Sequence, residues 1–560
     1  MIDGCLSDDL DKIANKFNEY FCNIGSNLAK KIPSGCVSFR QFLKNFRTES
    51  IFLQHVEESE IKKIVLSLKD GAPGVDEITA KALKQAVDVI VSPVSHICQL
   101  SMLQGHFPQE LKLAKIIPLY KGNDPSHFNN YRPISLLSVF SKILERVMYD
   151  RLYNYLTTLQ ILYEYQFGFQ KFKSTYMALL ALTDRITKAM ENGEFCVGVF
   201  IDFRKAFDTV DHSILLDKLY HYGVRGVAHD WISSYLTDRA QYVEYNGSKS
   251  KTLNIKCGVP QGSNLGPLLF LLYINDLAFV SPKLFSILFA DDSNFFCTGQ
   301  NLSDIFDTVN HELNAIVDWL NSNKMSLNVD KTHFMVFHPK GKKIPDNMNI
   351  EILGSKISEV KYTKFLGVII DSNLTWKNHI QYISSKISKN VGIIKKARTI
   401  LAKETLLTLY YSFIYPYLNY CVHIWGSSND TVLRKLLLLQ KKVVRIICGV
   451  NRLSHSEPLF KSLSVLTIPK LFKYNIGLLM YKYHHGLLPQ ILDIFERNQD
   501  VHHYDTRQAN LLHVPIFKTE LGKRSYHYQA VKIWNEIYST FSVNVKIGTF
   551  KKKLKYFLLQ

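Results

Sequence analysis

The sequence predicts an α+β fold in which strands and helices alternate over the first two thirds of the chain and helices alone follow. Short apolar runs of strand length, such as residues 196–201 and 287–290, occur between longer segments whose apolar residues recur at helical spacing. Beyond residue 371 only the helical spacing continues. With 560 residues, 46% of them hydrophobic, the chain can build three or four substructures around a large core.

The amino-terminal part of the chain is predicted to be helical. Residues 10–32 carry an amphipathic pattern that we interpret as a connector or support helix. A second helical pattern ends at Gly71, and the Ala-Pro-Gly turn at 72–74 leads to another helix. Residues 113–121 predict a short strand, and residues 131–135 predict a turn before a helix over 138–152, because Pro133 keeps the residue before it extended.

A basic and aromatic cluster follows at residues 166–175, which read QFGFQKFKST. Lys171 and Lys173 lie among Phe167, Phe169 and Phe172. Such a cluster could contact phosphates and stack on bases, although the rings could equally belong to the core. A helix is predicted directly after it.

Three acidic residues stand at the ends of predicted strands in the centre of the chain. Residues 196–201 are continuously apolar, as expected of a strand covered on both faces, and Asp202 follows them. Asp291 and Asp292 stand at the turn of a predicted hairpin over residues 286–297. Because adjacent carboxylates repel, such a pair either faces water or is neutralised by a divalent cation such as Mg²⁺, which prefers oxygen ligands.

Between these acidic sites, the sequence predicts a helix over 213–222 and strands over 242–257 joined by the Asn-Gly turn at 246–247. GVPQGS at 258–263 then precedes an apolar run of helical length with Pro267 in its first turn. Backbone donors and Gln261 are therefore expected near a helix amino terminus. Further helices are predicted over 302–322, 380–401, 403–418 and 432–448.

The formal charge of +19 is concentrated at the carboxyl end, because residues 371–560 hold 28 Lys and Arg residues but only 10 Asp and Glu residues. This imbalance indicates a polyanionic partner, and nucleic acid is the natural candidate. No run approaches 18 uncharged apolar residues, and no signal pattern opens the chain, so we expect a soluble intracellular protein without a membrane partner. Nine cysteines scattered singly argue for buried reduced thiols rather than a zinc site or a disulfide framework.

Three motifs in this order resemble the palm of the reverse transcriptases of non-LTR retrotransposons of the LINE type, especially the jockey-like ones. They are Asp202 after its strand, Gly-Val-Pro-Gln-Gly at 258–262 and Phe-Ala-Asp-Asp at 289–292. Residues 325–337, with Lys331, resemble a fourth palm motif, and residues 362–370 resemble the primer-grip hairpin. The resemblance covers about residues 60–370.

The resemblance implies a right-hand polymerase fold with fingers, a palm of antiparallel sheet and helices, and a helical thumb, followed by an α-rich basic C-terminal region. We expect an N-terminal helical connector over 1–60, fingers and palm over 61–370, thumb and post-thumb helices over 371–480, and the basic region over 481–560. Such a protein would be an RNA-directed DNA polymerase, acting in the nucleus, the cytoplasm or both as a ribonucleoprotein. Its partners would be an RNA template, a DNA primer and deoxynucleoside triphosphates.

The resemblance also assigns residues to the two-metal transfer of a nucleotide. Two Mg²⁺ ions, for which Mn²⁺ could substitute, would be held by Asp202, Asp291 and the backbone carbonyl of Phe203. Asp292 would assist beside the primer end, and Lys331 is a candidate proton donor to the leaving pyrophosphate.

Other residues would contact the nucleotide or the nucleic acid. Phe207, five residues after Asp202, would exclude the 2′-hydroxyl of a ribonucleotide. The remaining nucleotide-binding candidates are Gln261, Gly262 and Arg132, with Lys142 and then Arg146 ranked behind Arg132. The planar fork of arginine suits phosphate. The candidates for nucleic-acid binding are Lys171, Lys173, Phe365 and Gly367.

Two alternatives stay open at this point. A catalytically silent RNA-binding remnant would use the basic region equally well, and an RNA-dependent RNA polymerase would share the palm but is disfavoured by the bulky Phe207. The endonuclease domain common upstream in such elements is expected to be missing, so we expect either a fragment of a longer polyprotein or a truncated copy. Nothing in the sequence indicates an oligomeric state.

Overall fold

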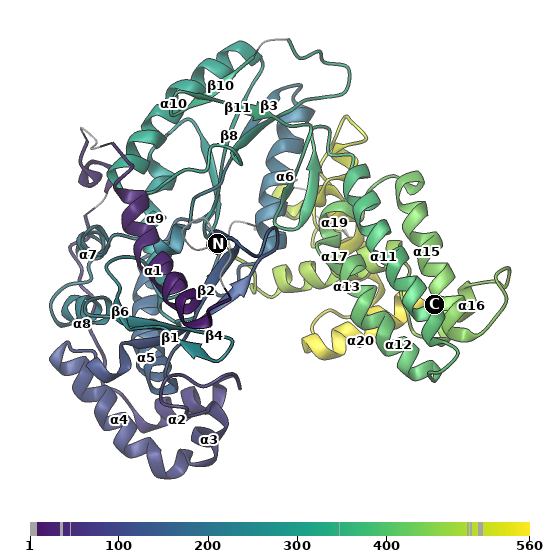
Figure 1. The fold of residues 1–560 in the computed structure, drawn as a ribbon. Helices are drawn as coiled ribbons and strands as arrows, with labels where there is room; N and C mark the ends of the chain where they lie inside the picture. The colour runs from purple at the N-terminus through teal and green to yellow at the C-terminus, as the bar shows by residue number, and fades with distance from the viewer. Residues whose placement is uncertain are drawn as a thin grey trace.

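The computed structural model describes residues 8–33, 37–44, 46–345, 348–489, 492, 495–501 and 508–560. It contains the mixture of helices and sheets that the sequence predicts. Figure 1 shows two groups of elements: the sheets with their helices from the first two thirds of the chain, and beside them a group of helices from the C-terminal third.

The strands and helices have the following bounds. The strands are β1 (Leu113–Tyr120), β2 (Tyr131–Leu136), β3 (Phe195–Ile201), β4 (Ala240–Tyr245), β5 (Ser248–Lys249), β6 (Leu253–Asn254), β7 (Phe285–Phe289), β8 (Asp292–Gly299), β9 (His333–Phe337), β10 (Ile350–Ile352), β11 (Ser355–Glu359), β12 (Tyr362–Phe365) and β13 (Val368–Asp371). The helices are α1 (Leu10–Ala29), α2 (Glu58–Ser67), α3 (Ala80–Gln85), α4 (Val87–Gln104), α5 (Val139–Thr158), α6 (Thr175–Glu191), α7 (His212–His221), α8 (Val227–Leu236), α9 (Gly266–Ile274), α10 (Leu302–Ser322), α11 (Lys377–Ala397), α12 (Lys403–Phe413), α13 (Tyr415–Asn419), α14 (Val422–Trp425), α15 (Asp430–Cys448), α16 (Glu457–Ser462), α17 (Ile468–His484), α18 (Asn498–Val501), α19 (Tyr526–Thr540) and α20 (Ile547–Leu559).

The central sheet has six strands in the order β10-β11-β9-β3-β8-β7. Every residue of β3 is buried, because its alternate side chains enter two different cores. Val197 and Val199 join a core that includes residues of α9 and α10, whereas Cys196 and Phe200 join a core that includes α6 and the C-terminal helices. The prediction that residues 196–201 form a strand covered on both faces is confirmed.

A second sheet has the order β2-β1-β4-β5, with β6 also paired to β4. Residues 131–135, predicted to be a turn, instead belong to strand β2, which pairs antiparallel with β1. Pro133 does keep the chain extended there. Since β2 lies at the edge of the sheet, the missing N–H of a proline is tolerated in that strand.

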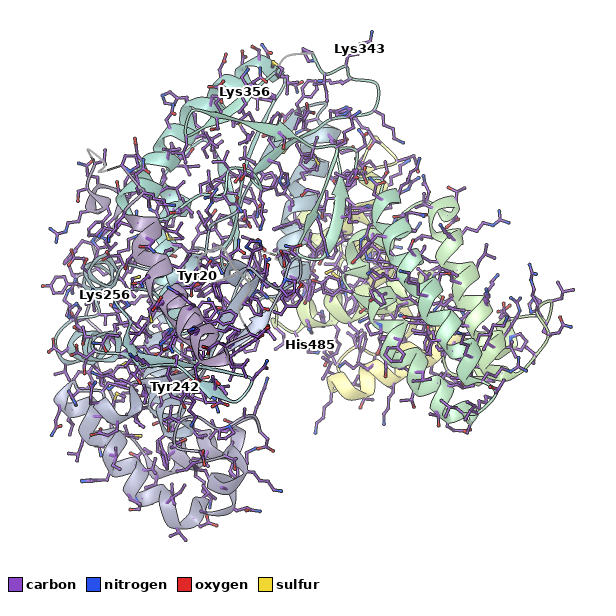
Figure 2. The ribbon with its side chains drawn as sticks, in the orientation of Figure 1. Tyr20, Tyr242, Lys256, Lys343, Lys356 and His485 are labelled. Carbon is purple, nitrogen blue, oxygen red and sulfur yellow. The ribbon has the colours of Figure 1, made fainter. Side chains whose placement is uncertain are left out.

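Helix α1 packs on the second sheet, where Phe17 and Phe21 share a small core with Ile116 and Tyr131. Figure 1 shows α1 in front of β2 and β4. Tyr20 of this helix, labelled in Figure 2, has its ring 5.7 Å from the ammonium of Lys205. The predicted support helix therefore contacts the segment that follows Asp202.

The C-terminal helices are joined to the central sheet by a continuous core. Residues of α11, α15, α17 and α19 pack in one cluster with residues of α6 and of the hairpin β12–β13. His485, just after α17, lies on the side of the helical group that faces the sheets (Figure 2). The helix predicted over 403–418 is divided into α12 and α13, since Pro416 cannot donate the backbone hydrogen bond that continues a helix.

Within the described residues, no helix combines the length and the apolar character needed to span a lipid bilayer. The seven cysteines in the same part of the chain have free thiols, and five of them are buried. Cys5 and Cys36 lie outside the described residues.

Candidate active site

The pairing of β3 with β8 brings Asp202 to the Asp291–Asp292 turn. Ile201 lies opposite Ser293 in this antiparallel pair, so the next residues in the same register are Asp202 and Asp292. β7 and β8 close the hairpin with Phe289 opposite Asp292, which leaves Ala290 and Asp291 in the turn. The three carboxylates therefore meet at one end of the central sheet.

The carboxylates at this end repel one another. Burial by the surrounding chain, followed by the charges of Asp291 and Asp202, raises the pKa of Asp292 to about 6. The pKa of Asp291 is also raised by burial and by Asp202, although the cations of Arg132 and Lys121 oppose this effect. Both side chains still reach solvent. A bound cation would relieve this repulsion, and the oxygen donors suit a hard divalent ion.

Asp202 is held by the segment between α10 and β9. The side-chain amide of Asn328 donates to Oδ2 of Asp202 at 2.9 Å, and the backbone N–H of Asn328 donates to the backbone carbonyl of Asp202 at 2.8 Å. The ammonium of Lys331 lies 3.8 Å from the same Oδ2 and is largely exposed. The structure thus places Lys331 beside the acidic cluster, and it adds Asn328, which the sequence motif did not single out.

Gln261 lies beside this cluster but bonds to a residue that the sequence reading passed over. Its side-chain amide donates to Oδ1 of Asp208 at 2.7 Å. Burial raises the pKa of Asp208, while Gln261, Lys205 and Lys121 lower it. Asp208 follows Phe207 directly in the chain. Only the fold reveals its partner, because Gln261 is distant in sequence.

Gly262 occupies a position that only glycine can fill. Its φ of +132° lies in the region that side chains avoid. A Cβ there would come within 2.5 Å of the carbonyl oxygen of Ser135 on β2. The turn at 258–263 therefore packs directly against β2, the strand that carries Arg132.

The ring of Phe207 is fixed from two sides. It stacks on Phe270 of α9 with ring centroids 4.3 Å apart. Phe169, at the edge-on distance of 6.0 Å, flanks it from the basic and aromatic loop. Phe169 is half exposed and has a positive φ of +51°. Phe207 thus has the rigid surroundings that a size-selecting side chain requires.

Three cations lie near the carboxylates, two of them beside the acidic cluster and Lys205 beside Asp208. Arg132 is exposed on β2, and Lys121 follows β1 at the start of the loop that joins β1 to β2. Burial, with Arg132 and Lys331 next in importance, lowers the pKa of Lys121, while Asp208 and Asp202 raise it. Burial also lowers the pKa of Lys205. Neither Lys121 nor Lys205 was predicted, because isolated lysines after a strand are common on any surface.

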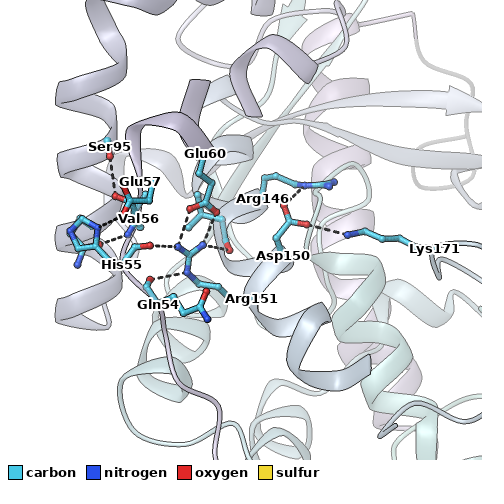
Figure 3. A network of polar contacts seen from close by, with 12 residues as sticks. Gln54, His55, Val56, Glu57, Glu60, Ser95, Arg146, Asp150, Arg151 and Lys171 are labelled. Atoms are coloured by element: carbon cyan, nitrogen blue, oxygen red, sulfur yellow. Dashed lines mark hydrogen bonds and ion pairs between the residues drawn. The ribbon is translucent and has the colours of Figure 1, made fainter. Parts of the chain in front are cut away.

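Lys171 and Lys173 have different surroundings. Lys171 is exposed, 3.4 Å from Oδ1 of Asp150, and Oδ2 of Asp150 accepts from Nε of Arg146 at 2.9 Å (Figure 3). Lys173 is mostly buried and donates to the backbone carbonyls of Glu164 and Gln166 at 2.6 and 3.0 Å. Burial lowers the pKa of Lys173 to about 8. The structure therefore gives Lys173 internal partners, whereas Lys171 remains accessible.

Helix α5, which carries Asp150, is tied to the segment before α2. The Arg151 guanidinium binds both oxygens of Glu60, at 2.8 and 3.0 Å, and donates to the backbone carbonyls of Gln54 and His55 (Figure 3). A cavity of about 1440 Å³ is lined by Gln54, His55, Glu60 and Arg151 of this network, and it reaches past Lys171 to residues 486–489. Phe172, 82% exposed, lines it as well.

Phe365 and Gly367 lie at the hairpin β12–β13. Phe365 is buried beside Phe200 of β3, with ring centroids 6.2 Å apart. The hydroxyl of Tyr420 donates to the carbonyl of Leu366 at 2.7 Å, and its ring lies against Gly367. This hairpin therefore packs between the central sheet and the C-terminal helices.

Comparison with known proteins agrees with the architecture of this site. Residues 121–370 match the family model described as "Reverse transcriptase (RNA-dependent DNA polymerase)", so this part of the chain is similar to the reverse transcriptases. The predicted resemblance to the enzymes of non-LTR retrotransposons is confirmed by relatives that extend beyond these residues.

The chain is 28% identical, over 78% of its length, to the RNA-directed DNA polymerase from mobile element jockey of Drosophila melanogaster, and covers 48% of that protein. It is 29% identical, over 74% of its length, to the probable RNA-directed DNA polymerase from transposon X-element of the same species, covering 46% of it. A Pol polyprotein from the type-1 element R1 of Bradysia coprophila is 26% identical over 68% of the chain, which covers 38% of that protein. The chain thus spans about half the length of the relatives it matches, or less.

Proposed function

We propose that this chain is an RNA-directed DNA polymerase that extends a DNA primer on an RNA template, using deoxynucleoside triphosphates. The observation that carries the proposal is the meeting of Asp202, Asp291 and Asp292 at one end of the central sheet. Burial and the charges of Asp291 and Asp202 together raise the pKa of Asp292 to about 6, which supports a site that works with bound cations. The names of the relatives point to the same activity.

In this proposal the six-stranded sheet with α9 and α10 is the palm. The second sheet and helices α2 to α5 form the fingers, and the helices from α11 onward form the thumb and the regions after it. The division at residues 60, 370 and 480 remains as predicted from the sequence. Helix α1 adds a contact between the first segment and the palm through Tyr20 and Lys205.

Asp202, Asp291 and the backbone carbonyl of Phe203 would hold two Mg²⁺ ions. Among the described residues, no three His, Cys, Asp or Glu side chains form a complete metal site. This agrees with the way proteins bind Mg²⁺, which commonly takes one or two carboxylates and completes its shell with substrate phosphates and water. When bound, the ions would acidify the primer hydroxyl and neutralise the leaving pyrophosphate.

The protein groups around the carboxylates would orient the substrates. Asn328 fixes the rotamer of Asp202, and Lys331 adds a positive charge beside the departing phosphates. Arg132, Lys121 and Lys205 would bind the triphosphate, since the first two lie near Asp291 and Lys205 lies near Asp208. Asp208 would orient Gln261, and Gly262 lets its backbone approach the nucleotide.

The test is extension of a DNA primer on an RNA template with Mg²⁺ and deoxynucleotides, comparing wild type with Asp291→Ala/Asp292→Ala. We expect the double variant to lose at least about a hundredfold in rate. Its melting temperature and RNA affinity should stay at or above wild type, since the substitution removes repelling charges. If neither protein extends the primer but both bind RNA, the silent RNA-binding remnant is the better account.

A further inference from the structure

We propose that Gln166 is a positioning residue that aims the carboxylates of Asp291 and Asp292 by holding the backbone between them and β7. The inference rests on the proposed function, but it concerns a contact that exists in the protein by itself. Gln166 is the first residue of the basic and aromatic cluster at 166–175 and is 2% exposed.

The side chain of Gln166 acts as an internal acceptor for two backbone N–H groups. Its Oε1 accepts from the N–H of Ala290 at 2.9 Å and from the N–H of Gly168 at 2.9 Å. Ala290 directly precedes Asp291 and has a positive φ of +54°, a conformation that residues with a side chain adopt only when their surroundings enforce it. Gln166 supplies that enforcement where the turn has a buried donor to satisfy.

The backbone of the same segment extends the hairpin. The N–H of Phe167 donates to the carbonyl of Leu288 at 2.8 Å, and the N–H of Leu288 donates to the carbonyl of Tyr165 at 3.0 Å. Gly168 allows this approach, because a Cβ there would lie 2.3 Å from the nitrogen of Ala290. Residues 165–168 therefore pair with the backbone at the edge of β7, and the Gln166 side chain adds a hydrogen bond to the turn that follows β7.

Lys173, which is mostly buried, holds residues 164 and 166 through their backbone carbonyls. Its ammonium binds the carbonyls of Glu164 and Gln166, and the Gln170 side chain also donates to the Gln166 carbonyl, at 2.7 Å. Gln166 is thus held at its backbone by two donors and presents its side-chain oxygen to the turn.

The other half of the Gln166 amide, Nε2, is buried and has no hydrogen-bond partner within the part of the chain that the structure describes. A buried unpaired donor lowers stability. The hydrogen bonds of this side chain are those that its oxygen accepts from Ala290 and Gly168.

Three variants test the proposal. Gln166→Met keeps the length of the side chain but removes the acceptor, whereas Gln166→Glu keeps an oxygen in its place. Gln440→Met is the matched control, since Gln440 is also buried and its amide binds the backbone of Leu466 and Ile468, far along the chain from the site. The first measurement is backbone hydrogen exchange of peptides covering residues 285–297 in the metal-free protein. The second is the Mg²⁺ concentration that half-saturates primer extension.

Gln166→Met should speed exchange over 289–293 by about tenfold and raise the half-saturating Mg²⁺ several-fold, while RNA affinity stays unchanged. Gln166→Glu should restore slow exchange, and Gln440→Met should change neither quantity. Wild-type exchange over 289–293 in Gln166→Met would overturn the proposal, as would acceleration spread evenly over all peptides. If the wild type proves inactive, the exchange result still decides the role of Gln166, and only the polymerase assignment fails.

Discussion

The rigid packing of Phe207 leads to a prediction about which nucleotides the proposed polymerase accepts. Its ring is clamped between Phe270 and Phe169, so it cannot swing aside to admit a 2′-hydroxyl. We expect Phe207→Val to raise the relative efficiency with ribonucleotides by at least about tenfold. The measurement is kcat/KM for a matched ribo- and deoxynucleotide pair in primer extension.

Phe207→Tyr is the control for this prediction, because it keeps the bulk of the ring and should retain selection for deoxynucleotides. Continued rejection of ribonucleotides by Phe207→Val would show that another side chain excludes the hydroxyl. Phe169 would then be the next residue to change, since it is the half-exposed ring beside Phe207.

The charge of Asp292 leads to a pH-dependent stability. Burial and the neighbouring carboxylates raise its pKa to about 6 from its ordinary value of 3.8. The folded state therefore binds the proton more tightly than the unfolded state does, and stability falls as the pH rises through this window. In metal-free buffer, Asp292→Asn should melt at a higher temperature than wild type above about pH 6, and the difference should vanish near pH 4.

Because the side chain reaches solvent, we expect a shift of only a few degrees, measured by thermal unfolding across the pH range. Adding Mg²⁺ at pH 8 should stabilise the wild type more than the variant. A constant difference between the two proteins from pH 4 to pH 8 would mean that Asp292 does not titrate against its neighbours.

Sequence reasoning predicted some of these residues and missed others for a physical reason. Asp202, Asp291 and Asp292 could be identified because each stands at the end of an apolar run, which is a local pattern. The partners Asn328, Asp208 and Gln166 could not, since their roles depend on which distant segment lies beside them. The cluster that contains Lys173 has a composition typical of nucleic-acid binding, but in the folded chain the ammonium of Lys173 donates to backbone carbonyls.

Among the elements, the pair α11 and α15 best accounts for the basic character of the C-terminal third. A groove of about 530 Å³ between them is lined by three lysines, three serines and two leucines: Ser384, Ser385, Ser388, Lys389, Lys435, Leu438, Leu439 and Lys442. No carboxylate is among these residues. Ser384 is 1% exposed, and its hydroxyl has no partner in the described part of the chain. These groups suit a phosphate backbone.

Replacing Lys389, Lys435 and Lys442 together by glutamine should weaken RNA binding and reduce the slope of log affinity against log salt by about two, since three phosphates lose their partners. The measurement is a salt titration of RNA binding. The triple Gln variant of Lys551, Lys552 and Lys553 on α20 is the control, because it removes the same charge from another exposed helix. Equal losses of slope in the two variants would argue for diffuse attraction instead of a groove.

The elements themselves were predicted well where the pattern was local. The bounds of α10 and the presence of the hairpin β7–β8 follow from apolar spacing, whereas the hairpin β12–β13 was expected from the resemblance of residues 362–370 to the primer grip. Strand β2 was missed because a proline-containing segment reads as a turn until its edge position is known. Helix α12 was predicted too long, since the apolar spacing continues through Pro416 although the helix does not.

At the scale of the whole molecule, the sequence suggested successive regions, whereas the structure joins them. The core on one side of β3 contains residues of α6, β12–β13 and the helices as far as α20. Removing everything after Asp371 would therefore uncover an apolar face of α6, and a truncated protein could lose RNA binding through misfolding. Surface substitutions such as the lysine variants above avoid this difficulty. A boundary drawn from charge and periodicity cannot reveal a shared core, because the residues that share it are hundreds of positions apart.

The division of β3 between two cores also governs how the chain can mature during synthesis. α6 and β3 leave the ribosome well before the later residues of the same core, which run from Phe365 to Leu558. At a synthesis rate of about 5–20 residues per second, one face of the sheet stays uncovered for roughly ten seconds to about a minute, until the C-terminal helices have been made. During that interval the nascent chain exposes an apolar surface, so a chaperone that binds such surfaces would determine how much of the protein reaches the folded state.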